Sequence, residues 1–320
     1  MKRIPYCALL GLCCTSLLAQ VAQNPAKPPE QNAPVSVQNP IQVRVNLVNV
    51  LFTVTDKKDH MVLNLTKDDF QVFEDRKPQT ISFFSRETNL PLRIGVLVDT
   101  SNSVRERLHF EQESAIDFLS QTIRPGADQA FVVGFDVEPQ VLQDYTDDVD
   151  KLSTAIRGLQ AGGGTALFDA VFLACKQKML GLPPPEPYIR RVLIVVSDGR
   201  DNQSEHTRDE ALAMAQRAEA TIYAISTNNS GTNASTGYSQ GDKVLKYLAE
   251  QTGGKAFFPF EARDLAANFE EIARELRSQY SLAYTPTNPV HDGSFRTITV
   301  QALEKGLRVR AKTGYFAPSQ

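Results

Sequence analysis

Two kinds of hydrophobic pattern divide the chain into three zones. From Ile41 to about Glu87, apolar and polar positions alternate, which is typical of strands with one buried face. The alternating apolar positions are Val43, Val45, Leu47, Val50, Phe52, Val54, Phe70, Val72, Phe73, Ile81, Phe83 and Phe84. Turn-forming residues at 56–59 and 74–78 separate these runs. We predict three or four antiparallel strands here, too few to be stable alone.

The second zone, from Leu92 to about Tyr284, alternates continuous apolar runs with amphipathic segments. The runs are typical of strands buried on both faces, and they occupy 94–98, 130–133, 192–196 and 222–225. Apolar residues at helical spacing form one face of each helix between them, as in Leu108, Ala115 and Leu119, or Leu265, Phe269, Ile272 and Leu276. Thr207 and Glu210 form a capping box before a helix over 211–218. This alternation predicts an α/β fold with a doubly wound, mostly parallel sheet, similar to a Rossmann fold.

The third zone follows Tyr284, where the period-two alternation returns. Its apolar positions are Ile298, Val300, Ala302, Leu307, Val309 and Ala311. Two strands cannot bury a face, so we expect them to join the N-terminal strands in an accessory antiparallel β-sandwich, with the α/β domain inserted between the flanks. The predicted organisation is a signal peptide (1–22), a Pro-rich linker (23–40), a β-rich flank (41–90), the α/β domain (91–284) and a C-terminal β flank (285–320).

The N-terminal residues have the pattern of a secretory signal. Lys2 and Arg3 precede an apolar run over 7–18, and small residues follow at Ala19 and Ala22. The run is shorter than the roughly 20 apolar residues of a membrane-spanning helix. We therefore predict export to the periplasm, the cell surface or the medium, with no transmembrane segment once the signal is removed.

The composition of the chain bears on which partners it can bind and on whether it can form a disulfide. The 320 residues carry a net charge of −3, with 42% hydrophobic and 22% charged residues, as in ordinary globular proteins. This balance gives no electrostatic reason to expect nucleic acid as a partner. Cys7, Cys13 and Cys14 leave with the signal, unless Cys13 is the first residue of a lipoprotein. Cys175 then has no internal disulfide partner, and its helical run predicts a buried thiol.

Candidate chemistry lies in three segments that follow buried strands or open helices: 99–103, 162–165 and 197–199. Because parallel strands end at one edge of a sheet, we expect these segments to meet where open α/β folds bind ligands. Each segment alone can be explained as a helix cap or a turn. Together they place two carboxylates and three hydroxyl groups at one edge, without a thiol or an imidazole.

This set of oxygen ligands suits a hard divalent cation such as Mg²⁺. Ser101 and Ser103, two positions apart in a tight loop, can direct both hydroxyls at one ion. Asp99 and Asp198 can balance its charge, directly or through water. Neutral hydroxyls leave the ion electron-poor, so it can accept a carboxylate from outside.

At these residues the sequence resembles the von Willebrand factor type A domain and its metal-ion-dependent adhesion site. That site has the pattern Asp-x-Ser-x-Ser, a distant Thr and a distant Asp that commonly precedes Gly, matched here by Asp99, Ser101, Ser103, Thr165 and Asp198. The resemblance extends over about 92–284. It implies that the two serines bind the metal directly, Thr165 directly or through water, and the aspartates mainly through water.

The resemblance also implies a function. The expected cofactor is Mg²⁺, or else Mn²⁺ or Ca²⁺, and the expected partner is a protein that presents an acidic side chain. Segments 66–75, 284–286 and 314–315 resemble a bacterial branch of secreted proteins with a related A domain. We therefore expect an exported adhesion or protein-binding module rather than an enzyme.

Two alternatives remain open from the sequence. One is a metal-dependent hydrolase resembling the haloacid-dehalogenase-type phosphatases, but these need a second Asp where the chain has Ser101. His206 is the nearest candidate for a catalytic base, and a solvated loop histidine is its simpler interpretation. The other alternative is a structural module whose metal site is vestigial. The sequence does not predict the partner's identity or the oligomeric state.

Overall fold

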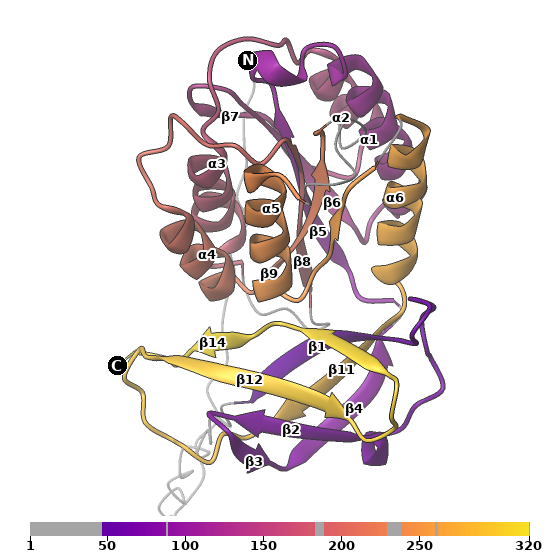
Figure 1. The fold of residues 1–320 in the computed structure, drawn as a ribbon, viewed down its shortest axis with the longest axis vertical. Coiled ribbons are helices and arrows are strands. Elements are labelled where there is room, and N and C mark those ends of the chain that lie inside the picture. Colours follow the sequence, from indigo (N-terminus) through magenta and orange to yellow (C-terminus); the bar gives the residue numbers. More distant parts are fainter. Residues whose placement is uncertain (1–46, 88, 183–188, 229–237, 260–261, 320) are drawn as a thin grey trace, which may run out of the picture. The chain divides into compact units, whose positions relative to one another are not determined.

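The computed structural model describes residues 47–87, 89–182, 189–228, 238–259 and 262–319 (Figure 1). The predicted signal peptide, the linker and the start of the β-rich flank lie outside these residues. The strands are β1 (Val48–Thr55), β2 (Phe70–Glu74), β3 (Lys77–Gln79), β4 (Ile81–Glu87), β5 (Leu92–Asp99), β6 (Gln129–Phe135), β7 (Pro139–Thr146), β8 (Arg190–Ser197), β9 (Ala220–Ser226), β10 (Ala256–Phe257), β11 (Gln279–Tyr284), β12 (Phe295–Ala302), β13 (Arg308–Ala311) and β14 (Gly314–Phe316). The helices are α1 (Leu108–Thr122), α2 (Val149–Arg157), α3 (Leu167–Leu173), α4 (Arg208–Arg217), α5 (Gln240–Gln251) and α6 (Ala262–Glu275).

The central sheet has the strand order β10-β9-β8-β5-β6-β7. Its strands run parallel except β7, which pairs antiparallel with β6. Helices α1, α2 and α6 cover one face and α3, α4 and α5 the other (Figure 1). The chain leaves β5 toward β6 and later returns to β8 on the other side of β5. The predicted doubly wound α/β architecture is confirmed.

Two four-stranded antiparallel sheets form the accessory sandwich, with the orders β13-β1-β11-β4 and β14-β12-β2-β3. Both sheets combine strands from the two ends of the chain, as predicted. Aromatic rings fill the space between them, with ring centroids 5.0 Å apart for Phe52 and Phe70 and 5.4 Å apart for Phe52 and Tyr280. The alternating apolar positions of the flanks therefore supply one shared core.

One strand differs from its predicted place. The sequence analysis put 279–284 in the α/β domain, but β11 pairs with β1 and β4 of the sandwich. All six residues of β11 are buried, because its sheet packs on the aromatic core on one face and on the α/β domain on the other. For example, Gln279 Nε2 donates to Thr53 Oγ1 in β1 and to Tyr223 Oη in β9. Its large apolar residues Tyr280, Leu282 and Tyr284 alternate with Gln279, Ser281 and Ala283 and belong to the sandwich core, so the period-two pattern of the C-terminal flank already begins in β11.

Two local predictions can be compared with the structure. The capping box is present: Glu210 N donates to Thr207 Oγ1 at 3.3 Å, and Thr207 N donates to Glu210 Oε2 at 2.8 Å. Helix α4 begins directly after this cap, three residues earlier than predicted. Cys175 is buried and unpaired, as expected, in a π-helical turn over Ala174–Met179. Among the described residues, no helix has both the length and the apolar character needed to cross a membrane.

Candidate metal centre

The three segments singled out from the sequence meet at the carboxyl edge of the central sheet. Strands β5 and β8 are neighbours, with Val98 paired to Val196, so Asp99 and Ser197 end adjacent strands. Ser197 Oγ donates a hydrogen bond of 2.6 Å to Asp99 Oδ2. The sheet thus places the first and third segments side by side, at the point where the chain reverses its winding direction.

The first segment turns tightly after β5. Asp99 is fully buried, and its Oδ1 accepts a hydrogen bond of 2.8 Å from Ser101 N. Ser101 precedes a short 3-10 helix over Asn102–Val104, and its hydroxyl lies 2.9 Å from that of Ser103. Ser101 is buried whereas Ser103 is exposed. The two hydroxyls therefore converge at a point that solvent reaches from one side.

The second segment packs against the first. Gly162 N donates to Thr100 O at 2.7 Å, and Asn102 Nδ2 donates to Gly163 O at 3.2 Å. Thr165 is buried, and its amide donates to Asn202 Oδ1 at 2.9 Å. Helix α3 begins after Ala166, so Thr165 is not its N-cap residue. The segment over 162–165 thus joins the loop after β5 to the loop after β8.

Asp198 begins the third segment and is held by its own loop. Its Oδ1 accepts a hydrogen bond of 2.9 Å from Arg200 N, and its side chain is almost fully buried. Gly199 has a φ of +75°, in the left-handed region that favours glycine. A Cβ there would lie 2.3 Å from Gly241 O at the start of α5. Glycine is therefore required for Asp198 to lie at this edge.

Glu111, on the buried face of α1, adds a third carboxylate near this edge that the sequence analysis did not identify. It is 2% exposed, and neither carboxylate oxygen has a hydrogen-bond partner among the described residues. Burial raises the pKa of Glu111 to about 8, and the negative charges of Asp99 and Asp198 add to the shift. Burial also raises the pKa of Asp99 to about 6, against the hydrogen bonds from Ser197 and Ser101. Ionisation of the acids at this edge is therefore costly without a compensating positive charge, and Glu111 keeps its proton at neutral pH in the metal-free protein.

A sequence signal for Glu111 exists. It lies three residues after Leu108 and four before Ala115, so helical periodicity puts it on the apolar face of α1. The sequence analysis included Ser197 in the segment 197–199 but did not predict a role for it, although it is the last residue of the buried strand β8.

His206, considered as a possible catalytic base, contacts two residues of α3. Its Nδ1 lies 2.7 Å from Asp169 Oδ1, and its ring stacks on Phe172 with centroids 3.7 Å apart. These contacts attach the loop before α4 to α3. Within the described residues, no group of three or more His, Cys, Asp or Glu side chains is arranged to hold a metal ion. A metal at this edge would therefore depend on hydroxyl groups beside the aspartates.

Comparison with known families identifies the domain that carries this edge. Residues 94–200 match the von Willebrand factor type A domain. The chain contains a von Willebrand factor type A domain. The match includes all five predicted site residues, and the sandwich flanks lie outside it. Among curated proteins, none matches the sequence.

Three solved structures are similar to this chain at low sequence identity. The domain of the type V pili tip protein Mfa5 from Porphyromonas gingivalis is 15% identical, with 58% of this chain and 94% of that chain covered and a TM-score of 0.46. A domain from Catenulispora acidiphila is 12% identical, with coverages of 87% and 75% and a TM-score of 0.49. The proximal thread matrix protein 1 of the mussel byssus, solved with a zinc-occupied adhesion-site motif, is 15% identical, with coverages of 63% and 49% and a TM-score of 0.49. These similarities are too low to carry a function to this chain.

Proposed function

We propose that this protein is an exported binding module in which a divalent cation at the carboxyl edge accepts a carboxylate from a partner protein. The predicted ligands are Asp99, Ser101, Ser103, Thr165 and Asp198. Export is supported by the N-terminal signal pattern, and a binding role by the domain family.

The observation that carries the proposal is the group of three buried carboxyl groups, one of them without a hydrogen-bond partner among the described residues, beside two converging hydroxyls. Asp99, Asp198 and Glu111 are all buried at one edge, and the raised pKa values of Asp99 and Glu111 reflect the cost of their ionisation there. The hydroxyls of Ser101 and Ser103 lie 2.9 Å apart, and Ser103 is exposed. Hydroxyl and carboxylate oxygens together suit Mg²⁺, Mn²⁺ or Ca²⁺ better than a softer metal.

Each residue has a distinct part in this arrangement. Ser101 and Ser103 present neutral oxygens, and Asp99 is fixed for the same edge by its bonds from Ser197 and Ser101. The cation would supply the positive charge that neutralises the edge and attracts an external carboxylate. Glu111 would not be a ligand. Its carboxyl group would act on the positive charge of the cation from a distance.

Metal binding is the first test. Titration of the full chain with Mn²⁺, followed by the electron paramagnetic resonance signal of the free ion, should show one saturable site. Ser101→Ala combined with Ser103→Ala should weaken binding about 100-fold, since two ligands are lost. Ser120→Ala is the matched control, because its exposed hydroxyl donates to Asp117 O on α1, away from the candidate metal centre. Equal affinity in the two variants would contradict the ligand assignment.

The second test separates adhesion from the alternatives. The full chain, immobilised, should retain proteins of its native secretome in Mg²⁺ and release them in EDTA, and the double serine variant should retain none. If the chain retains the same proteins in EDTA as in Mg²⁺, and the double serine variant retains them too, the metal site is vestigial. Metal-dependent hydrolysis of a phosphate ester that is lost in Asp99→Asn would instead indicate the enzyme.

A further inference from the structure

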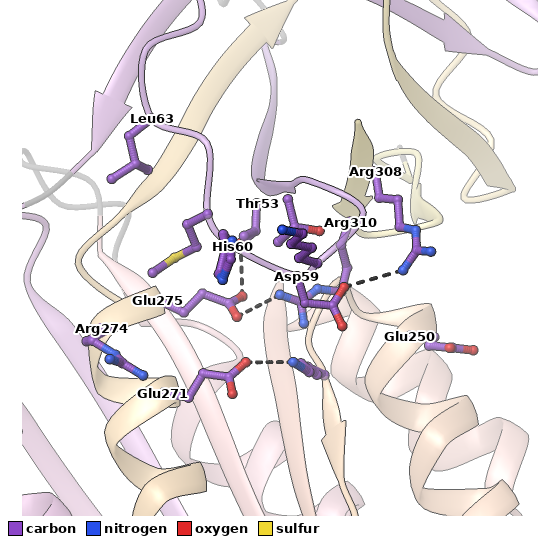
Figure 2. A pocket seen from close by; sticks show the side chains of 14 residues that line it. Thr53, Asp59, His60, Leu63, Glu250, Glu271, Arg274, Glu275, Arg308 and Arg310 are labelled. Carbon is purple, nitrogen blue, oxygen red and sulfur yellow. Dashed lines mark hydrogen bonds and ion pairs between the residues drawn. The ribbon is translucent and has the colours of Figure 1, made fainter. Parts of the chain in front are cut away.

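A cavity of about 840 Å³ lies away from the candidate metal centre, where the α/β domain meets the sandwich. It is lined by β1, the loop that follows β1, the last turns of α5 and α6, and β13 (Figure 2). Ligand sites have volumes of this order but are mostly apolar. This cavity differs because ionisable side chains dominate its lining.

The acidic side chains of the lining already have cationic partners. Glu275 accepts a hydrogen bond of 2.6 Å from Arg310 Nη2, and Glu271 lies 2.6 Å from Lys255 Nζ. Asp59 pairs with Arg308 at 3.3 Å, as Figure 2 shows. Glu250 pairs with a lysine outside the cavity, Lys246 at 3.8 Å. No acid of the lining is therefore available to balance a further cation.

The cations are in excess. Lys58, Lys255, Arg274, Arg308 and Arg310 line the cavity, against the four acids. Within the described ranges, the structure gives no partner to the side chain of Lys58 or Arg274. Lys58 and Arg274 are exposed, whereas Arg310 Nη1 is a buried donor without an acceptor among the described residues, so the charged groups of the lining that no protein atom pairs with are cationic donors.

We infer that this cavity binds a small anion that carries carboxylate or phosphate oxygens, at a site independent of the metal. Guanidinium groups bind both oxyanions through paired N–H donors, and Lys58 adds a point charge. The ligand would contact the loop after β1 together with α6 and β13, because those elements supply the unpaired donors. It would therefore connect the sandwich to the α/β domain.

The anion site is tested on the full chain by isothermal titration calorimetry in metal-depleted buffer without chelator, because EDTA is itself a polyanion. Inorganic phosphate and citrate are the two probes, and they distinguish phosphate from carboxylate recognition. At least one should bind saturably with one site per chain. Lys58→Gln and Arg274→Gln should each weaken binding about 10-fold through the loss of a charge-assisted hydrogen bond.

Both variants should fold, since neither side chain has a partner to lose. Lys243→Gln, an exposed lysine on α5 outside the cavity, is the matched control and should bind as the unchanged chain does. Thermal denaturation with and without the probe should show a rise in melting temperature that shrinks in the two cavity variants. The inference is overturned if neither probe binds, or if the cavity variants bind as tightly as Lys243→Gln. It does not depend on the proposed metal, so the serine double variant should leave anion binding unchanged.

Discussion

Two glutamates of equal burial, Glu111 and Glu275, have opposite surroundings. Each is 2% exposed. Glu275 accepts hydrogen bonds from Arg310 Nη2 at 2.6 Å, Tyr223 Oη at 2.7 Å and Thr53 Oγ1 at 2.9 Å. Glu111 accepts none among the described residues. A buried acid with donors contributes to the architecture, whereas the proposed cation site offers an explanation for a buried acid without donors.

The largest loss of stability should follow from removing the charge of Glu275, the glutamate that has hydrogen-bond donors. Glu275→Gln leaves Arg310 without its counter-charge at the junction between the sandwich and α6. We expect a loss of about 3 kcal/mol in the free energy of unfolding, measured by urea denaturation.

Glu271→Gln is the matched control, because its pair with Lys255 is about one-third exposed on both sides. It should cost less than about 1 kcal/mol. If the two variants cost the same, the bonds to Glu275 do not have the importance assigned to them.

A smaller effect is expected from Gly199→Ala at the unsatisfied edge. The added Cβ would lie 2.3 Å from Gly241 O, and backbone atoms cannot rotate away. We expect a loss of about 2 kcal/mol, together with weaker Mn²⁺ binding, because the loop that holds Asp198 must move. Gly126→Ala has a similar φ of +79° but open space around its Cβ, so it measures the backbone strain alone. Equal losses in the two variants would mean that the close approach to Gly241 is unimportant.

The last effect concerns pH, and the change expected per pH unit is smaller than the loss from either substitution. The pKa of Glu111 rises from its ordinary value of 4.5 to about 8 in the folded protein. Between these values the folded state holds a proton that the unfolded state has released, so stability should fall as pH rises. The slope from Glu111 is at most about 1.4 kcal/mol per pH unit, and it ends above pH 8.

Urea denaturation of the metal-free chain between about pH 6.5 and 8 would measure this slope, because Asp99, whose pKa is raised to about 6, contributes a slope of the same sign at lower pH. Glu111→Gln should flatten it, and so should saturating Mg²⁺. Glu106→Gln, an exposed glutamate just before α1, should leave it intact. A slope that persists in Glu111→Gln would assign the effect to another group.

Sequence patterns were sufficient for most of the fold, for reasons visible in particular strands. Strands β5, β6, β8 and β9 are buried on both faces, so their apolar runs are continuous. Strand β7 was not predicted because it is a partly exposed edge strand, with Val141 and Leu142 more than a third exposed. Strand β11 was assigned to the wrong unit because the boundary of the α/β zone was placed after Tyr284, although Tyr280, Leu282 and Tyr284 already alternate with smaller or polar residues.

The candidate site was predictable only in part. Its five proposed ligands follow a recognisable spacing, and the sheet places their segments at one edge. The lack of hydrogen-bond partners for Glu111 could be seen only in the tertiary structure, because helical periodicity predicts burial and not which groups contact a buried acid. The charged cavity could not be predicted from the sequence, because its lining residues extend from Thr53 to Arg310 and no local pattern connects them.

The interleaved sandwich has a consequence for biosynthesis. Thr53 and Glu275, which bond across the junction, are 222 positions apart. Strands β1, β2 and β4 leave the ribosome well before β11 and β12, with which they pair, are made. At about 5–20 residues per second, the intervening domain takes some tens of seconds to synthesise or less. During that interval the apolar faces of the early strands are unprotected, so a chaperone that holds nascent β-strands should raise the yield of folded chain.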